Sequence, residues 1–156
     1  MQIEITNKQK IKPVKRTLLK KILSETAHRM DVPCGDLSVI ICDDVEIKNM
    51  HRDFFDDDTV TDVITFPLSD YTEEGFVSGE IIVSLERAFA QCKEFDTKPE
   101  EEFALYLIHS FLHLMGYEDY PAKKRAAMKK VEEKLFNEIR KELPLEGMFA
   151  ARRKKI

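Results

Sequence analysis

The sequence has few cysteines and no long apolar segment, and each shortage excludes a class of protein. Cys34, Cys42 and Cys92 are too few and too scattered for a disulfide framework or a Cys-x-x-Cys metal knuckle. No window approaches the roughly 18–20 uninterrupted apolar residues of a membrane span, so we expect no membrane association. The first residues lack a basic start followed by an apolar stretch. We therefore expect no signal peptide, and a cytoplasmic protein with reduced thiols.

Internal repeats, low-complexity tracts and linkers rich in Pro, Gly or Ser are also missing. The chain has 156 residues, of which 43% are apolar and 35% charged, which is enough apolar material for one core. We therefore predict a single domain over residues 1–142, followed by a basic C-terminal tail over residues 143–156.

Charge is unevenly distributed, although the net charge is only -4. Basic residues dominate residues 1–21 and the C-terminal tail, whereas acids cluster over residues 43–80. The mild overall acidity argues against a protein coated in positive charge for nucleic-acid binding. The local basic segments are either solvated surface or sites of phosphate contact.

Hydrophobic periodicity predicts the secondary structure. Alternating and β-branched residues predict strands over residues 2–6, 37–42, 62–66 and 79–84. Apolar residues at spacings of three and four predict helices over residues 13–30, 85–95, 99–115 and 121–141. The order of these segments favours an α+β fold, with a small mixed four-stranded sheet flanked by about five helices.

The helix over residues 99–115 has the clearest ends. Thr97 is expected to cap it, Pro99 suits its first turn, and Gly116 suits a left-handed stop. The helix is nearly all apolar from Phe103 onward, so we expect it to be buried in the centre of the domain.

The end of this helix carries the residues most suited to chemistry. His109 and His113 are four residues apart, so both rings leave one face of the helix and can each place a nitrogen about 2 Å from one divalent ion. Gly116 allows the chain to turn, and Asp119 can then return as an oxygen ligand. We predict a metal site formed by His109, His113 and Asp119, occupied by one zinc ion.

Two alternatives remain open at this site. The histidines could be hydrogen-bonded core residues, and Asp119 or Glu118 could instead cap the helix that begins near Pro121. The spacing is also similar to the zinc helix of metzincin-type proteases. Those enzymes need a glutamate directly after the first histidine as a general base, and Ser110 occupies that position here.

A second polar stretch, Asn-Met-His-Arg-Asp at residues 49–53, is predicted to be a loop that leads into a strand. An arginine in such a loop is usually a surface residue. If Arg52 lay beside the metal site, its planar guanidinium would match phosphate oxygens. His51 could be a further acid or base, and simple exposure is the better interpretation.

Taken together, these segments resemble the YbeY family of bacterial rRNA maturation endoribonucleases. The family signature His-Gly-x-Leu-His-Leu-x-Gly-Tyr-Asp-His aligns with residues 109–119, where Ser110 replaces the glycine and Asp119 stands in place of the third histidine ligand. Met128 lies where the family has a methionine. The resemblance extends over about residues 2–140.

Two upstream segments support the same resemblance. The family has an arginine followed by a Thr-Asp-Val-Leu-Ser-Phe-Pro strand, which matches Arg52 and residues 61–67, Thr-Asp-Val-Ile-Thr-Phe-Pro. The family segment Gly-Asp-Ile-x-Ile-Ser matches residues 79–84.

The resemblance implies a zinc-dependent endoribonuclease that acts in 16S rRNA processing and ribosome quality control. The implied partners are single-stranded rRNA, the ribosome and ribosomal proteins. In this interpretation His109 and Arg52 are catalytic residues, since Arg52 would offset the charge that develops on the phosphate. Basic residues of the N-terminal helix and the tail would hold the RNA backbone.

Two other functions remain open. One is a metal-dependent hydrolase of another substrate, including peptides, although Ser110 argues against peptides. The other is a non-catalytic ribosome assembly factor in which the metal only stabilises the fold.

Overall fold

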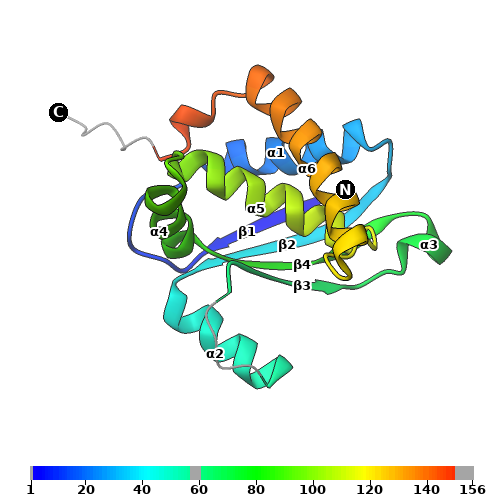
Figure 1. Ribbon diagram of the computed structural model, residues 1–156, viewed down its shortest axis with the longest axis horizontal. Helices are drawn as coiled ribbons and strands as arrows, with labels where there is room; N and C mark the ends of the chain where they lie inside the picture. The colour runs from blue at the N-terminus through cyan, green and yellow to red at the C-terminus, as the bar shows by residue number, and fades with distance from the viewer. Residues whose placement is uncertain (1, 57–60, 150–156) are drawn as a thin grey trace.

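The computed structural model describes residues 2–56 and 61–149, which form one sheet covered by helices (Figure 1). The strands are β1 Gln2–Asn7, β2 Cys34–Cys42, β3 Val63–Pro67 and β4 Val77–Ser84. The helices are α1 Arg16–Arg29, α2 Asp44–Phe55, α3 Tyr71–Glu74, α4 Leu85–Phe95, α5 Pro99–Leu114, α6 Ala122–Glu142 and the short 3-10 helix η1 Leu145–Gly147. This arrangement confirms the expected α+β class.

The four strands form a mixed sheet in the order β1-β2-β4-β3. β1 pairs parallel with β2, and β2 pairs parallel with β4. β3 lies at the edge and pairs antiparallel with β4. An edge position explains why the strand includes Pro67, where we expected it to stop, because an edge residue can do without a backbone donor.

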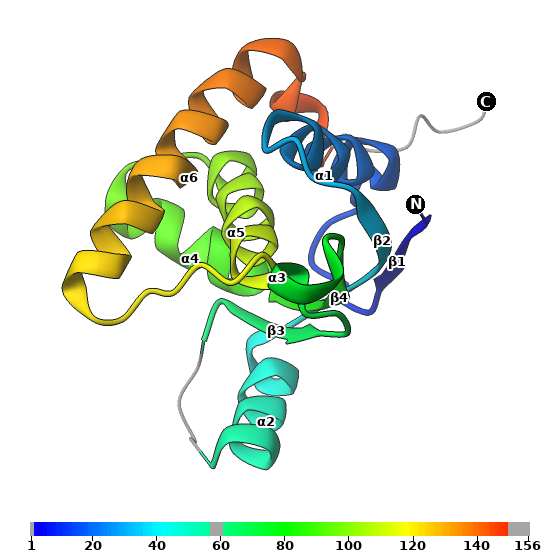
Figure 2. The same ribbon diagram turned by 90° about the vertical axis from the view of Figure 1, so that its right-hand side faces the viewer.

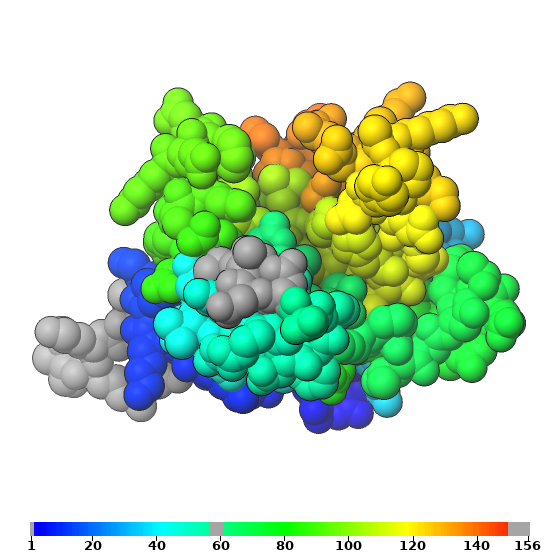
Figure 3. Space-filling view, turned by 60° about the horizontal axis from the view of Figure 1, so that its bottom comes forward, coloured from blue at the N-terminus to red at the C-terminus, as the bar shows by residue number. Residues whose placement is uncertain are grey.

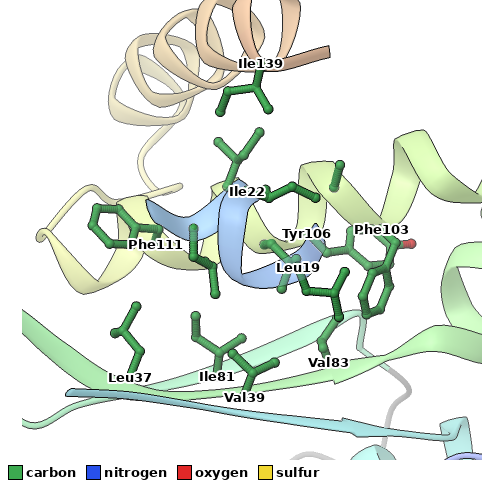
Figure 4. Packing of buried hydrophobic residues seen from close by; sticks show 14 of the residues in the cluster. Leu19, Ile22, Leu37, Val39, Ile81, Val83, Phe103, Tyr106, Phe111 and Ile139 are labelled. Carbon is green, nitrogen blue, oxygen red and sulfur yellow. The ribbon is translucent and has the colours of Figure 1, made fainter. Parts of the chain in front are cut away.

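Helices cover the two faces of the sheet unequally. α1, α4, α5 and α6 lie on one face, and α2 lies on the other (Figures 1 and 2). The main core fills the space between the sheet and the first group of helices (Figure 4). It is lined by fully buried aliphatic and aromatic side chains, among them Leu19, Ile22, Leu37, Val39, Ile81, Val83, Phe103, Phe111 and Ile139.

Helix α5 is the buried central helix that the sequence predicts. Its side chains include the fully buried Phe103, Leu107 and Phe111. The helix approaches β4 closely at Gly79, where an added Cβ would lie 2.7 Å from Leu114 Cδ2 and 2.7 Å from the carbonyl oxygen of Phe66. A glycine is therefore required at this position for α5 to lie against the sheet.

The start of α5 differs from the expected capping. The N-cap residue is Lys98, not Thr97, and it makes no side-chain capping bond. The Thr97 hydroxyl instead donates to Glu102 Oε1 at 2.7 Å. The first turn keeps Pro99 and three glutamates, which complement the positive end of the helix dipole.

Helix α2 corrects the prediction that residues 49–53 form a loop. Asp43 caps it by accepting a hydrogen bond from the backbone N–H of Glu46 at 2.9 Å. Only Ile47 of this helix is fully buried, but the sequence does carry an apolar stripe at helical spacing, formed by Ile47, Met50 and Phe54. Ile47 packs in a small second core on the far face of the sheet, together with Cys42, Ile64 and Ile82.

A polar network joins the start of α2 to the start of α4. The Ser84 hydroxyl donates to Asp44 Oδ1 at 2.8 Å, and the Arg87 guanidinium donates to Asp44 Oδ2 at 2.8 Å. Burial alone would raise the pKa of Asp44, but the hydrogen bonds from Arg87 and Ser84 outweigh it and lower that pKa. The network therefore links elements on the two faces of the sheet through an ionised carboxylate.

The chain beyond α6 returns to the main core. Leu145 and Met148 are buried there, and the backbone N–H of Lys15 donates to the carbonyl of Met148 at 2.8 Å. The basic run of the expected tail, at residues 152–155, lies outside the described residues. Within the described part of the chain, no helix has both the length and the apolar character to cross a membrane.

Candidate metal centre

His109 and His113 occupy the last turns of α5, on the side that the fold leaves half-buried. Their rings cross at 87°, and their Nε2 atoms lie 2.9 Å apart. Two ring nitrogens that face one another at this distance need either a shared proton or a cation between them. The helix therefore brings the two predicted ligands together as the four-residue spacing requires.

The turn after α5 carries the chain back toward these histidines. Gly116 has a φ of +100° and donates its N–H to the carbonyl of His113 at 2.9 Å, while the N–H of Tyr117 bonds the carbonyl of Leu112 at 3.0 Å. The left-handed conformation at Gly116 is the expected one. The turn also places the carbonyl of Tyr117 3.0 Å from His113 Nδ1.

Asp119 completes the cluster. Its Oδ2 lies 3.5 Å from His113 Nε2, and one atom from each of His109, His113 and Asp119 can be chosen so that all three lie within 4.8 Å of one another. The helix that follows has Pro121 at its N-cap position and no side-chain capping bond. Asp119 therefore faces the histidines and does not cap the next helix.

The spacing of these atoms fits a small divalent ion. A tetrahedral zinc ion, with bonds of about 2.0–2.1 Å, separates two of its ligand nitrogens by about 3.3 Å. The two separations from His113, 2.9 Å to His109 and 3.5 Å to Asp119, bracket that value, and all three donors lie within 4.8 Å of one another. Two imidazoles and one carboxylate also leave a fourth coordination position open, as in catalytic zinc sites. Asp119, whose side chain is 58% exposed, lies on the solvent side of the cluster.

Glu132 is a member of the site that sequence reasoning missed. It projects from α6, its side chain is only 17% exposed, and its Oε1 lies 3.4 Å from His109 Nδ1. In the sequence it belongs to a stretch of lysines and glutamates that is typical of solvated helix surface. Its one distinguishing signal is its position four residues after Met128, which is fully buried in the main core.

The electrostatics of the two histidines differ. Burial alone would lower the pKa of His109, but the hydrogen bond and the negative charge of Glu132 outweigh it, so that the pKa is raised. Burial and the neighbouring charge of His109 both lower the pKa of His113. Glu132 thus favours a proton on Nδ1 of His109, which leaves Nε2 of this ring directed at His113.

A pocket of about 420 Å³ opens beside the cluster, on the side of the α3 loop. It is lined by residues 67–72 and by residues 113–116, so His113 forms part of its wall. Figure 3 shows this side of the molecule, with the yellow surface of the turn and the start of α6 next to the green surface around α3. A substrate bound in this pocket would lie directly beside His113.

The structure does not bring Arg52 into contact with the cluster. Arg52 lies on α2, across the sheet from α5 (Figures 1 and 2), and its Nε is 3.3 Å from Oδ1 of Asp53. Half of its side chain is exposed. His51, on the same helix, packs its ring 5.7 Å from that of Phe55.

Comparison with known proteins gives a consistent result. The sequence profile of the family described as "Endoribonuclease YbeY" matches residues 2–140. A protein of that name from Chlorobaculum tepidum is 36% identical over 128 residues, which cover 82% of this chain and 90% of the relative. Another from Syntrophotalea carbinolica is 32% identical over 145 residues, or 90% of this chain and 97% of the relative.

A solved structure is also similar. The solution structure of TM1509 from Thermotoga maritima aligns with a TM-score of 0.60 at 28% sequence identity. The alignment covers 97% of this chain and 99% of the other.

Proposed function

Because the chain belongs to the YbeY endoribonuclease family, we propose that it is a zinc-dependent endoribonuclease that cleaves single-stranded RNA. The cluster of His109, His113 and Asp119 carries this proposal, since it is a compact donor set with an open side. The family name supports RNA as the substrate.

Each residue of the site has a distinct task in this proposal. His109 and His113 offer Nε2 to the ion, and Asp119 offers a carboxylate oxygen. Glu132 accepts a hydrogen bond from Nδ1–H of His109, and the carbonyl of Tyr117 accepts one from Nδ1–H of His113. When bound, zinc supplies a Lewis acid that polarises the scissile phosphate or lowers the pKa of water.

Arg52 is proposed as the residue that offsets negative charge on the RNA phosphate. Its guanidinium is half-exposed, and its partner Asp53 is itself exposed, so a phosphate can displace this weak surface pair. Since α2 and the cluster lie on different faces of the sheet, we propose that the RNA strand passes the β3 edge to contact both.

The biological setting is likewise a proposal. We infer that the substrate is rRNA, that the cleavage serves 16S rRNA maturation and ribosome quality control, and that the protein works in the cytoplasm with the ribosome and ribosomal proteins. The family name supports cleavage of RNA, and the other roles are proposed from the resemblance in the sequence.

Parallel assays on single-stranded RNA and on an unstructured peptide test the proposed substrate class. We expect zinc-loaded protein to cleave the RNA and to leave the peptide intact, because Ser110 provides no general base for peptide hydrolysis. Cleavage of the peptide alone would point to another hydrolase. Cleavage of neither substrate by fully loaded protein would favour a structural metal.

A further inference from the structure

The start of α6 is an exposed basic surface. Residues 122–131 contain five cations and no acid: Lys123, Lys124, Arg125, Lys129 and Lys130. All five side chains belong to exposed residues. In this stretch Met128 is the one buried residue, and its side chain packs in the main core.

Most of these charges lack a partner within the described part of the chain. The Lys124 side chain pairs with Glu118 at 2.7 Å, but the side chains of the other four form no ion pair or hydrogen bond with any described residue. Two cations next to the end of α6, by contrast, have acidic partners. Arg140, near the end of α6, pairs with Glu101, and Arg29 of α1 contacts three glutamates.

The placement of these cations works against the helix itself. Lys123, Lys124 and Arg125 occupy the first turn, where the helix dipole is positive and acids are the favourable residues. That turn contains no acid and no side-chain cap. Arg125 and Lys129 add a like-charge pair at a spacing of four. A segment that breaks local helix rules without a stabilising gain is typical of a functional surface.

This surface borders the candidate metal centre. α6 begins three residues after Asp119. Arg125 and Lys129 precede Glu132 by seven and three residues, so they share its side of the helix. Since Glu132 contacts His109, that side of the helix faces the cluster. The yellow surface in Figure 3 includes this start of α6.

We propose that the α6 basic row, defined as Arg125 and Lys129, binds the phosphate backbone of single-stranded RNA and guides it to the metal centre. The inference rests on the proposed function and adds the surface that holds its substrate. Unpaired exposed cations beside an open site are the groups that neutralise RNA phosphates. The positive end of the α6 dipole adds to the same attraction.

The test is binding of a fluorescently labelled oligouridine of about 12 nucleotides at several salt concentrations, in a chelator so that cleavage does not interfere. The variant Arg125→Gln/Lys129→Gln removes both charges of the row. The matched control, Lys123→Gln/Lys130→Gln, removes two exposed charges from the opposite side of the same helix.

Each phosphate contact on single-stranded RNA contributes about 0.7 to the slope of log K against log salt. We therefore expect the row variant to lose about 1.4 from that slope and to bind several-fold more weakly at low salt, while the control is unchanged. An unchanged row variant would overturn the inference and would leave an acidic protein as the alternative partner. Equal losses in both variants would overturn it as well, because they would indicate only a general charge effect.

Cleavage by the wild-type protein separates this inference from the proposed function. If the row binds RNA in a salt-dependent way but the protein does not cleave RNA, the proposed endonuclease function is refuted and the RNA-binding role of the row is supported. If the protein cleaves RNA and the row does not contribute to binding, the endonuclease function is supported and the role of the row is refuted.

Discussion

Nδ1 of His109 on α5 lies 3.4 Å from Oε1 of Glu132 on α6, while Nε2 of the same ring faces His113. The contact joins two helices, and both side chains are largely shielded from water. A carboxylate behind a histidine fixes the ring and its tautomer, and raises the basicity of the nitrogen that binds a metal. Glu132 therefore belongs to the site even though it is not a predicted ligand.

Removing the Glu132 carboxylate should weaken metal binding. We expect Glu132→Ala to lower zinc affinity by about 10–100-fold in a competition titration with a chromophoric chelator. Glu132→Gln should recover part of this loss, because its amide oxygen can still accept the Nδ1 proton. Glu133→Ala, on the exposed side of the same helix, is the control. Equal affinities for all of these proteins would show that Glu132 has no positioning role.

Arg52 should matter for cleavage and not for the metal. If its guanidinium stabilises charge on the phosphate, Arg52→Ala should reduce RNA cleavage by about 10²–10³-fold. Zinc content and the thermal unfolding midpoint should stay at wild-type values, because the side chain is half-exposed on α2. Lys48→Ala on the same helix controls for loss of a nearby cation. Full RNA cleavage activity in Arg52→Ala would show that Arg52 has no catalytic role.

Gly79 should not tolerate a side chain. In Gly79→Ala the new Cβ would meet the carbonyl oxygen of Phe66 and the side chain of Leu114 at 2.7 Å each. We expect a loss of about 1–3 kcal/mol in the free energy of unfolding, measured with urea. Gly147→Ala, where no atom lies within 4 Å of the added Cβ, should be nearly neutral. Equal stability of the two variants would contradict the close approach of α5 to β4.

The contact between Asp44 and Arg87 should make stability depend on pH. The folded protein holds the pKa of Asp44 below its usual value of about 3.9. The carboxylate therefore contributes stability above that pH, and the contribution is lost as the pH falls through the lower folded pKa. We expect Asp44→Asn to cost about 1–3 kcal/mol at pH 7, and less near pH 3. A cost that is the same at both values would show that ionisation of Asp44 plays no part.

Features with a local signal could be predicted from the sequence. Helix α5 was predictable because Pro99 and three glutamates mark its start and its apolar residues require burial. The cluster was predictable for the same reason, since His109, His113 and Asp119 lie on one helix turn and the loop that follows.

Features that depend on distant contacts could not be predicted in this way. Helix α2 is an exception, because Ile47, Met50 and Phe54 have helical spacing and the prediction of a loop overlooked that pattern. Glu132 reaches His109 only because α6 packs on α5, and its position four residues after Met128 is its one distinguishing signal in the sequence. The resemblance implied that Arg52 is a catalytic residue, and the structure places it on α2, across the sheet from α5. Its role remains a prediction.

The central claim is that His109, His113 and Asp119 hold a zinc ion on which RNA cleavage depends. The most direct measurement is the zinc content of purified protein by elemental mass spectrometry, with single-stranded RNA cleavage assayed on the same samples. We predict about one zinc per chain in the wild-type protein, and loss of both zinc and cleavage in His113→Ala. A small fraction of one equivalent in the wild-type protein, or zinc and cleavage that persist in His113→Ala, would contradict the claim.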